Sequence, residues 1–310
     1  MNHFFAFLAT AAVPCVTLPP VVITPPVVMP PAPPVAPAGT IATPANVQAA
    51  IAAAKPGDTI TLASGSYPRI VIKGKTWATP ITLDATAANI TQLTIDSSSG
   101  VKVLGGTFSG AKGVSYLGYS AHVLNSRFVS FTAPQISNSL RGIVIDMSSD
   151  VDVTKAAMTG LSVDGIDISR SQRVKVTYSS CTAFKTSTAH PDCIQAWSRP
   201  GKITSDVLVA YNTMDSQNTQ GIFFGNHVRN GVDDGGFDRI TITYNTIRGS
   251  YPNGIAVAAC RACTVTDNKA VTMLGSKYKV NITLYGKGIT AARNVLGKEQ
   301  AMTIDRMIDS

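Results

Sequence analysis

A pair of short β-rich segments recurs along the chain and restricts the fold more than any other sequence feature. The first segments begin two residues before Ile143, Ile166, Ile194, Ile222 and Ile255, and all but one carry a glycine directly before the isoleucine. The second segments begin at Val151, Val174, Val207, Ile240 and Cys263. Repeating units of roughly 22 to 33 residues indicate stacked coils, in which each coil packs only on its neighbours.

An asparagine follows the second segment in the later units. Asn212, Asn245, Asn268 and Asn294 occupy this position. An amide repeated at one corner can bond to the coils above and below it. Together the patterns predict an all-β, single-stranded right-handed parallel β-helix. An antiparallel β-sandwich is the rival fold, but it would not keep equivalent residues in every repeat.

The segment before the repeats predicts a short helix that caps the solenoid. Residues 45–54 are rich in alanine, with Thr43 as N-cap and Pro44 at the first helical position. A terminal coil needs such a cover because its outer side has no neighbour. The β-helix domain is therefore expected to span residues 45–310.

The preceding residues predict export. Residues 4–13 are apolar and small residues stand at 9–11, so residues 1–11 are interpreted as a signal peptide. Residues 12–44 are interpreted as a proline-rich linker of extended polyproline type. The expected location is secreted or periplasmic.

The cysteines fit an oxidising compartment. Cys181, Cys193, Cys260 and Cys263 can form two disulfides or remain as buried free thiols. Cys260 and Cys263 also have the spacing of half a zinc site, but no second cysteine or histidine pair matches it. Disulfides and free thiols both remain open.

The composition excludes several classes of protein. Only one of the 18 acidic residues is a glutamate, Glu299, which argues against a helical bundle. No apolar run approaches the roughly 20 residues of a membrane span, so no integral membrane span is expected. The net charge of +8 suits a polyanion, yet lysine and arginine do not cluster as in a nucleic-acid-binding arm. We expect a monomer whose partner is an acidic polysaccharide and not nucleic acid.

Two stretches resemble a known superfamily. Residues 54–67 (AKPGDTITLASGSY), with Thr79–Leu83 after them, are similar to the first coil of secreted pectate-lyase-like β-helix proteins. That group includes chondroitinase-B-like and alginate-active enzymes. The resemblance implies the β-helix fold and leaves the reaction open, because lyases, epimerases, hydrolases and phage tail fibres share this coil.

Shorter motifs resemble particular enzymes only in part. The stretch from Asp164 to Asp167 (DGID) is similar to the core of polygalacturonases, but their paired-aspartate, Gly-His-Gly and Arg-Ile-Lys motifs are absent. The Asp-Pro-His-Asp motif of mannuronan epimerases is also absent, and His190-Pro191-Asp192 has a different order. The chain reproduces none of these catalytic sets.

Stacking predicts a functional face. Outward residues of adjacent coils lie about 4.8 Å apart, so Asp164 neighbours Asp192, and Asp167 neighbours Gln195. Stacked carboxylates repel, so a cation must compensate or a pKa must rise. In the alternative interpretation, Asp164 and Asp192 only cap turns by accepting bonds from backbone N–H groups.

Twelve residues form the predicted site. The predicted catalytic residues are Lys185, His190, Asp192 and Arg199; the predicted substrate-binding residues are Asp164, Asp167, Arg170, Gln195, Trp197, His227, Arg229 and Tyr251. His190 or Lys185 is expected to be the base, with Asp192 orienting His190, while Trp197 stacks on a sugar. The arginines and Gln195 are expected to hold the substrate carboxylate. Lys73, Lys75 and Arg141 on earlier coils are the next candidates.

No cofactor is required by the sequence, although calcium is considered. Asp233 and Asp234 in the long connection 226–239 could contribute to a calcium site, which needs six to eight oxygens. A solvated turn is the alternative, and no metal ligand is assigned.

Three functions are weighed. The leading hypothesis is an exported polysaccharide lyase that cleaves a uronate-containing, alginate-like glycan by β-elimination. The second is a glycoside hydrolase that uses Asp164, Asp167 and Asp192 as acid and base. The third is a non-catalytic, glycan-binding surface protein.

Overall fold

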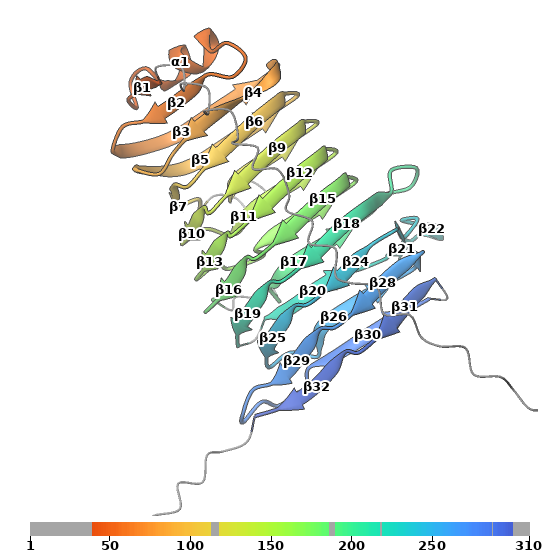
Figure 1. Cartoon of the computed structure of the whole chain (residues 1–310). Helices are drawn as coiled ribbons and strands as arrows, with labels where there is room; N and C mark the ends of the chain where they lie inside the picture. Colours follow the sequence, from red (N-terminus) through yellow and green to blue (C-terminus); the bar gives the residue numbers. More distant parts are fainter. Residues whose placement is uncertain (1–38, 113–117, 186–189, 218, 287, 300–310) are drawn as a thin grey trace, which may run out of the picture. The chain divides into compact units, whose positions relative to one another are not determined.

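A computed structural model describes residues 39–112, 118–185, 190–217, 219–286 and 288–299. The described chain winds through short parallel strands that stack coil upon coil (Figure 1). The predicted right-handed parallel β-helix is confirmed. The predicted signal peptide and most of the predicted linker lie outside the described residues.

One face of the solenoid is a parallel sheet, here called sheet A. Its strands, in order along the stack, are β1 (Thr40–Ala42), β2 (Thr59–Leu62), β4 (Thr76–Asp84), β6 (Ser99–Leu104), β9 (Arg127–Thr132), β12 (Ser149–Thr154), β15 (Gln172–Thr177), β18 (Thr204–Ala210), β24 (Thr241–Thr243), β28 (Cys263–Thr266) and β31 (Ile289–Ala292). Two short strands, β23 (Phe237–Asp238) and β27 (Cys260–Arg261), extend it beside β18. β1 belongs to this sheet, so the last residues of the predicted linker are part of the solenoid.

The remaining parallel strands form two further rows, B1 and B2. Row B1 contains β3 (Gly65–Lys73), β5 (Ala88–Asp96), β8 (Tyr119–Leu124), β11 (Arg141–Asp146), β14 (Ile166–Ser169), β17 (Asp192–Trp197), β20 (Gln220–Phe224), β26 (Asn253–Ala258) and β30 (Asn281–Tyr285). Row B2 contains β7 (Thr107–Ser109), β10 (Gln135–Ser137), β13 (Ala157–Thr159), β16 (Ser180–Thr182), β19 (Thr213–Ser216), β25 (Thr246–Gly249), β29 (Lys269–Thr272) and β32 (Val295–Lys298). A complete coil such as β11, β12 and β13 thus visits B1, sheet A and B2 in turn.

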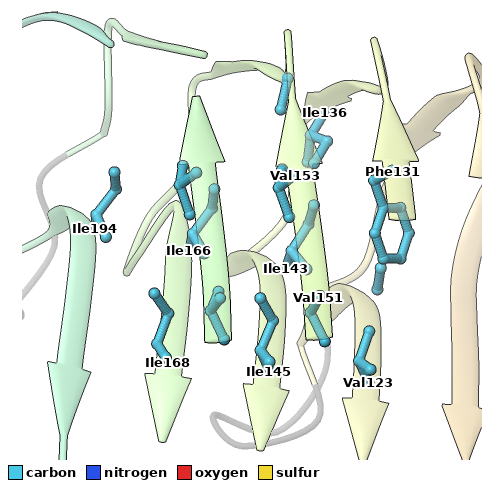
Figure 2. Packing of buried hydrophobic residues seen from close by; sticks show 14 of the residues in the cluster. Val123, Phe131, Ile136, Ile143, Ile145, Val151, Val153, Ile166, Ile168 and Ile194 are labelled. Atoms are coloured by element: carbon cyan, nitrogen blue, oxygen red, sulfur yellow. The ribbon is translucent and has the colours of Figure 1, made fainter. Parts of the chain in front are cut away.

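The predicted register of the repeats is confirmed. Ile143, Ile166, Ile194, Ile222 and Ile255 are strand partners in succession along row B1. All five are completely buried. Figure 2 shows such isoleucines and valines in columns that fill the inside of the solenoid. The apolar core is therefore the stack of inward residues, and the residues between them face outward.

The predicted asparagine ladder is also confirmed. Asn212 Nδ2 donates to Asn245 Oδ1 at 3.0 Å, Asn245 Nδ2 to Asn268 Oδ1 at 2.9 Å, and Asn268 Nδ2 to Asn294 Oδ1 at 3.0 Å. Each amide also donates to a backbone carbonyl, as Asn245 does to Val209 O. The ladder satisfies polar groups at a buried corner, where unpaired groups are costly.

We expect Asn245→Ala to lower the free energy of unfolding by about 1–3 kcal/mol, because the buried Asn212 N–H groups lose their acceptor Asn245 Oδ1 and Val209 O loses its donor Asn245 Nδ2. Chemical denaturation monitored by circular dichroism measures the change. Thr246→Ala is the matched control, since Thr246 is the exposed next residue and should change stability by less than about 0.5 kcal/mol. Equal effects of the two variants would contradict a structural role for the ladder.

Three tyrosines stack on the outer surface beside this corner. Tyr178, Tyr211 and Tyr244 each precede the corner in successive coils and have positive φ values of 53°, 59° and 54°. Their ring centroids are 5.0 and 5.1 Å apart, with interplanar angles of 5° and 2°. We call this row the tyrosine ladder; its rings cover one another's faces and leave their edges in solvent.

The predicted capping helix is present but starts later than expected. Helix α1 spans Val47–Ala53, with Asn46 rather than Thr43 at the N-cap. The reason is a preceding turn, in which Asn46 Oδ1 accepts hydrogen bonds from the backbone N–H and the hydroxyl of Thr43. Val47 and Ile51 are buried against the first coil, so α1 covers that end of the core.

The four cysteines of the described residues form two disulfides, Cys181–Cys193 and Cys260–Cys263. This decides between the alternatives that the sequence left open and excludes both free thiols and a zinc half-site at these positions. Among the described residues, no helix has the length and apolar character needed to cross a membrane.

Candidate functional site

A column of polar side chains runs across the start of row B1. Arg141, Asp164, Asp192, Gln220 and Asn253 each stand two residues before the inward isoleucine of their coil. Parallel pairing in register places them over one another along the stack. The column therefore brings one cation, two carboxyl groups and two amides into contact range.

The predicted aspartates, two in this column and Asp167 beside it on β14, are buried. Asp164, Asp167 and Asp192 expose 4%, 2% and 0% of their surface. Arg141 Nε lies 3.0 Å from Asp167 Oδ2 and 3.5 Å from Asp164 Oδ2. These carboxyl groups are therefore withdrawn from the outward face that the stacking pattern predicts, and the Arg141 guanidinium lies against two of them. We call the three residues the carboxyl cluster.

Hydrogen bonds join the cluster. The backbone N–H of Asp192 donates to Asp164 Oδ1 at 3.0 Å, so the turn-capping interpretation holds for Asp164. Gln195 Nε2 donates to Asp192 Oδ2 at 2.9 Å. In the described structure, the Oδ1 atoms of Asp167 and Asp192 are buried without a hydrogen-bond partner. A buried carboxylate oxygen without a partner is costly, which favours a protonated carboxyl group.

The electrostatics of the cluster follow from burial. Desolvation, and then the nearby charge of Asp164, raise the pKa of both Asp167 and Asp192 well above 3.8. Burial also raises the pKa of Asp164, although the N–H of Asp192 and the Arg141 charge oppose the rise. The expected compensation of stacked aspartates thus takes both forms, a cationic side chain and raised pKa values.

We expect the stability of the protein to decline as pH rises above the ordinary Asp pKa of 3.8, through the titration of Asp192. A carboxyl group whose pKa is raised by folding binds more protons in the native than in the unfolded chain. Its stabilising contribution is complete below the unfolded pKa and is lost as pH rises through the folded pKa. Asp192→Asn should therefore be more stable than the parent by at least about 1 kcal/mol at about pH 8 and similar to it at about pH 4.

Denaturant unfolding at the two pH values tests this expectation. Asparagine keeps an oxygen that accepts from Gln195, so the hydrogen bond to Gln195 can be retained. Asp152→Asn is the control because the Asp152 side chain is half-exposed beside Lys175. A stability gain of Asp192→Asn that is equal at both pH values would contradict the titration argument.

An open pocket lies next to the cluster. Gln195, Ala196, Trp197, Arg199, Phe223 and His227 line a cavity of about 220 Å³, which we call the Trp197 pocket. Gln195 connects the two regions, since its amide bonds to Asp192 while its side chain also borders the pocket. Four predicted site residues, Gln195, Trp197, Arg199 and His227, thus meet in one cavity.

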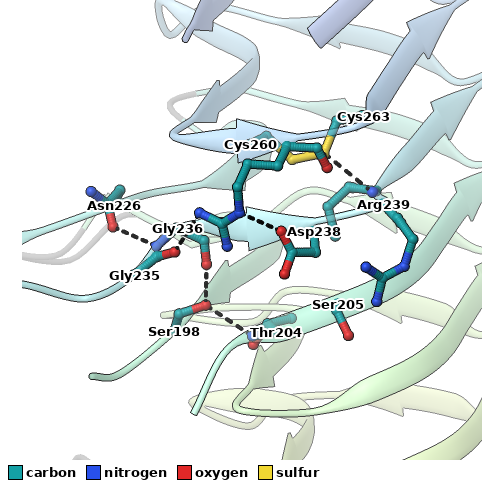
Figure 3. Close-up of polar contacts among 12 residues, drawn as sticks. Ser198, Thr204, Ser205, Asn226, Gly235, Gly236, Asp238, Arg239, Cys260 and Cys263 are labelled. Atoms are coloured by element: carbon teal, nitrogen blue, oxygen red, sulfur yellow. Dashed lines mark hydrogen bonds and ion pairs between the residues drawn. A yellow bond between two sulfur atoms is a disulfide. The ribbon is translucent and has the colours of Figure 1, made fainter. Parts of the chain in front are cut away.

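Two long connections between strands, residues 198–206 and 226–239, hold this pocket in place. Ser198 Oγ donates to Gly236 O and accepts from the N–H of Thr204, and Asn226 Oδ1 accepts from the N–H of Gly236 (Figure 3). Within the second connection, β21 (Val228–Arg229) and β22 (Val232–Asp233) form an antiparallel hairpin. The loops that carry Arg199 and His227 are therefore fastened to each other and to the coils.

Asp233 and Asp234 are committed to other contacts. Asp234, almost fully buried, forms an ion pair with Arg199 at 3.2 Å. Asp233 accepts from the N–H of Gly235 and from Asn226 Nδ2. Among the described residues, no group of three or more His, Cys, Asp or Glu side chains is arranged to hold a metal ion. The geometry thus assigns Asp234 to fixing the Arg199 guanidinium.

His190 has a different partner from the one expected. Its Nδ1 lies 3.0 Å from Gln220 Nε2, whereas Asp192 bonds to Gln195. Asn253 Nδ2 donates to Gln220 Oε1 and so fixes the amide orientation. His190 still lies close enough to the cluster for its charge to lower the pKa of Asp164. Gln220, and not Asp192, is the residue that orients this imidazole.

Besides the carboxyl cluster and His190, four further predicted residues are not part of the Trp197 pocket lining. Arg170 pairs with Asp146 and borders a separate groove at the corner between row B1 and sheet A. Lys185 is exposed, and its aliphatic part is next to Gly160. Tyr251 lines a different cavity together with Tyr278. Arg229 belongs to β21, and the position of its side chain lies outside what the structure describes.

Sequence reasoning missed three contributors. The sequence places Arg141 only among the further candidates and does not single out Gln220 or Phe223. All three nevertheless occupy the aligned positions around Asp164 and Asp167. The signal that could have found Arg141 and Gln220 was the column itself, because each stands two residues before an inward isoleucine. Their charge and amide groups complete the hydrogen-bonding and electrostatic environment of the aspartates and His190.

Comparisons with known proteins identify the fold. No protein-family model and no curated protein matches the chain. Among solved structures, an exopolygalacturonase of Yersinia enterocolitica is similar with a TM-score of 0.50 and 11% identity, over 84% of this chain. The chain spans 66% of that protein's length.

Two further similar structures have other functions. An alginate lyase from a Paenibacillus species has a TM-score of 0.44 and 17% identity, over 83% of this chain and 96% of the lyase. A surface adhesin of Streptococcus pneumoniae has a TM-score of 0.47 and 12% identity, over 79% of this chain and 80% of the adhesin. At 11% identity, the likeness to the exopolygalacturonase establishes a shared fold and leaves the function to the residues of the site.

Proposed function

We propose that the chain is an exported polysaccharide lyase that cleaves a uronate-containing glycan in the Trp197 pocket by β-elimination. One observation carries the proposal: an open cavity gathers an arginine, an amide, an imidazole and two aromatic rings. The carboxyl cluster that a hydrolase would need lies behind its wall, at most 4% exposed. The two disulfides suit an exported protein.

β-Elimination needs three kinds of group. A base removes the proton on the carbon beside the uronate carboxylate, a cation or amide stabilises the enolate that forms, and an acid protonates the leaving glycosidic oxygen. The carbon–oxygen bond to the leaving sugar breaks as a carbon–carbon double bond forms. The new unsaturated end distinguishes this reaction from hydrolysis.

The pocket residues suit these roles. Arg199, held by Asp234, and Gln195, held by Asp192, can bind the substrate carboxylate in a fixed orientation. His227 is the exposed imidazole of the pocket and is proposed as the base in place of His190. Trp197 and Phe223 offer aromatic surface for a sugar ring. The net charge of +8 favours a polyanionic substrate.

Hydrolysis is the second candidate because the pKa values of Asp167 and Asp192 are raised by burial. A carboxyl group that stays protonated can serve as a general acid. Gln195 bonds to Asp192 and also lines the Trp197 pocket. This route requires Gln195 to move so that a carboxyl group can touch the glycosidic oxygen.

Incubation of the purified protein with polygalacturonate, alginate and hyaluronan tests both candidates. A lyase produces ultraviolet absorbance from the unsaturated uronate together with new reducing ends. A hydrolase produces reducing ends without that absorbance, and a glycan-binding surface protein retains the polymer without cleaving it. Either of the last two results would overturn the lyase proposal.

A further inference from the structure

A second cavity lies at the other end of the row B1 strands. It has a volume of about 400 Å³ and is lined by Gln217, Ser250, Tyr251, Leu274, Gly275, Ser276, Lys277 and Tyr278. These residues precede β20, β26 and β30, whereas the Trp197 pocket is formed along and beyond β17 and β20. We call it the tyrosine cavity, and none of the roles in β-elimination is assigned to it.

Two turns of adjacent coils supply the whole lining of the cavity except Gln217. Residues 273–280 form a turn anchored at both ends, where Met273 N–H donates to Gly249 O and Val280 N–H donates to Thr272 Oγ1. Leu274 N–H is also held by the carboxylate of Glu299. The neighbouring turn, which carries Tyr251, is tied to the next coil through the bond from Asn281 N–H to Pro252 O. The cavity walls are therefore set by the stacked coils.

The aromatic rings form an open wedge. Tyr251 and Tyr278 have centroids 6.1 Å apart and planes tilted by 52°, so their faces do not cover each other as they do in the tyrosine ladder. Tyr278 is 44% exposed, so its ring is accessible from solvent. Two tilted, accessible aromatic faces provide a surface for the C–H groups of a sugar ring.

The polar groups of the cavity select for negative charge. Lys277 is the only charged residue in the described lining, and its Nζ lies 5.1 Å from the centre of the Tyr278 ring. The turn 273–280 contains two lysines and no acidic residue. Ser276 Oγ is buried with no hydrogen-bond partner among the described groups, and Gln217 adds an exposed amide. The lining thus combines a cation, unused hydrogen-bonding capacity and aromatic surface.

From this combination we infer that the tyrosine cavity is a second glycan-binding site, specific for an acidic sugar whose carboxylate pairs with Lys277 while its ring packs between Tyr251 and Tyr278. An adjoining cavity of about 770 Å³ shares Gln217 and Leu274 with it. The site holds the polymer at a place separate from the Trp197 pocket, and its existence does not depend on cleavage there.

Binding of glucuronate to the full chain tests the inference, because a monosaccharide has no glycosidic bond to cleave. Titration is followed by nuclear magnetic resonance in a Trp197→Ala background, which removes the aromatic platform of the other pocket. We expect binding to persist in that background and to weaken about tenfold or more when Tyr278→Ala is added. Lys277→Gln should remove the preference for glucuronate over glucose.

Tyr285→Ala is the matched control, since Tyr285 is 63% exposed on β30 and does not line the cavity. It should leave the affinity for glucuronate unchanged. Loss of all binding in Trp197→Ala with an intact fold, or unchanged binding in both Tyr278→Ala and Lys277→Gln, would overturn the inference. Failure of the polymer-cleavage assay would leave this result untouched, so the two proposals fail separately.

Discussion

Replacing Arg141 by methionine is expected to lower the free energy of unfolding by about 3 kcal/mol. The guanidinium lies 3.0 Å from Asp167 and 3.5 Å from Asp164, whose carboxyl groups are almost completely buried. Removing one partner of a buried ion pair leaves an uncompensated charge in a medium of low polarity. Urea denaturation at about pH 8 measures the loss, which should shrink at about pH 4 as the carboxyl groups become protonated.

Arg173→Met is the matched control. Arg173 also bonds to an aspartate, Asp150, through two nitrogens, but its side chain is half-exposed. Exposed ion pairs contribute little because water screens them and the side chains lose freedom on pairing. No measurable change is expected for Arg173→Met. A similar loss in both variants, or a loss in Arg141→Met that does not depend on pH, would contradict the role assigned to Arg141.

The His227→Gln variant is expected to lower kcat on a cleavable polyuronate by about 100-fold or more, the usual scale for the loss of an acid–base group. Glutamine keeps a polar side chain of moderate size but cannot accept the substrate proton at neutral pH. His227 is exposed on the rim of the Trp197 pocket and is not part of the core, so its replacement should leave the unfolding transition unchanged. Initial rates over a range of substrate concentrations separate kcat from KM.

Lys202→Gln serves as the comparison for this variant. Lys202 is an exposed cation on the loop that carries Arg199, and its Nζ contacts Met147 Sδ outside the pocket. Its replacement should change the rate less than about twofold. If His227→Gln retained the parent activity, the base would lie elsewhere, and His190→Gln would be the next variant to measure.

The sequence patterns were sufficient to predict the register of the solenoid. Inward apolar residues must recur at equivalent positions in successive coils, because a slip of one residue would turn the whole apolar set outward. In the later coils, asparagines recur at one corner as well. This constraint made the columns of Ile143 to Ile255 and of Asn212 to Asn294 visible in the sequence. The same columns correctly placed Asp164 beside Asp192 and Asp167 beside Gln195.

The environment of each site residue was harder to predict, since it depends on side-chain reach and on irregular turns. Arg141 reaches over the next coil to cover two aspartates, and alignment alone does not reveal that reach. Tyr251 stands in a turn between rows, where repeats differ in length, so the stacking rule gave no position for it. The partner of His190 is set by an amide network that extends two coils further, through Gln220 to Asn253.

The stacked rings of the tyrosine ladder are expected to give a circular dichroism signal that reports the folding of the middle coils. Nearly parallel phenol rings at 5.0 and 5.1 Å couple their electronic transitions, and the rings come from three successive coils. Near-ultraviolet circular dichroism senses aromatic rings held in fixed asymmetric packing. Because each coil is supported by its neighbours, this signal requires an assembled middle of the solenoid, and detachment of any one of the three coils removes at least one of the two stacked pairs.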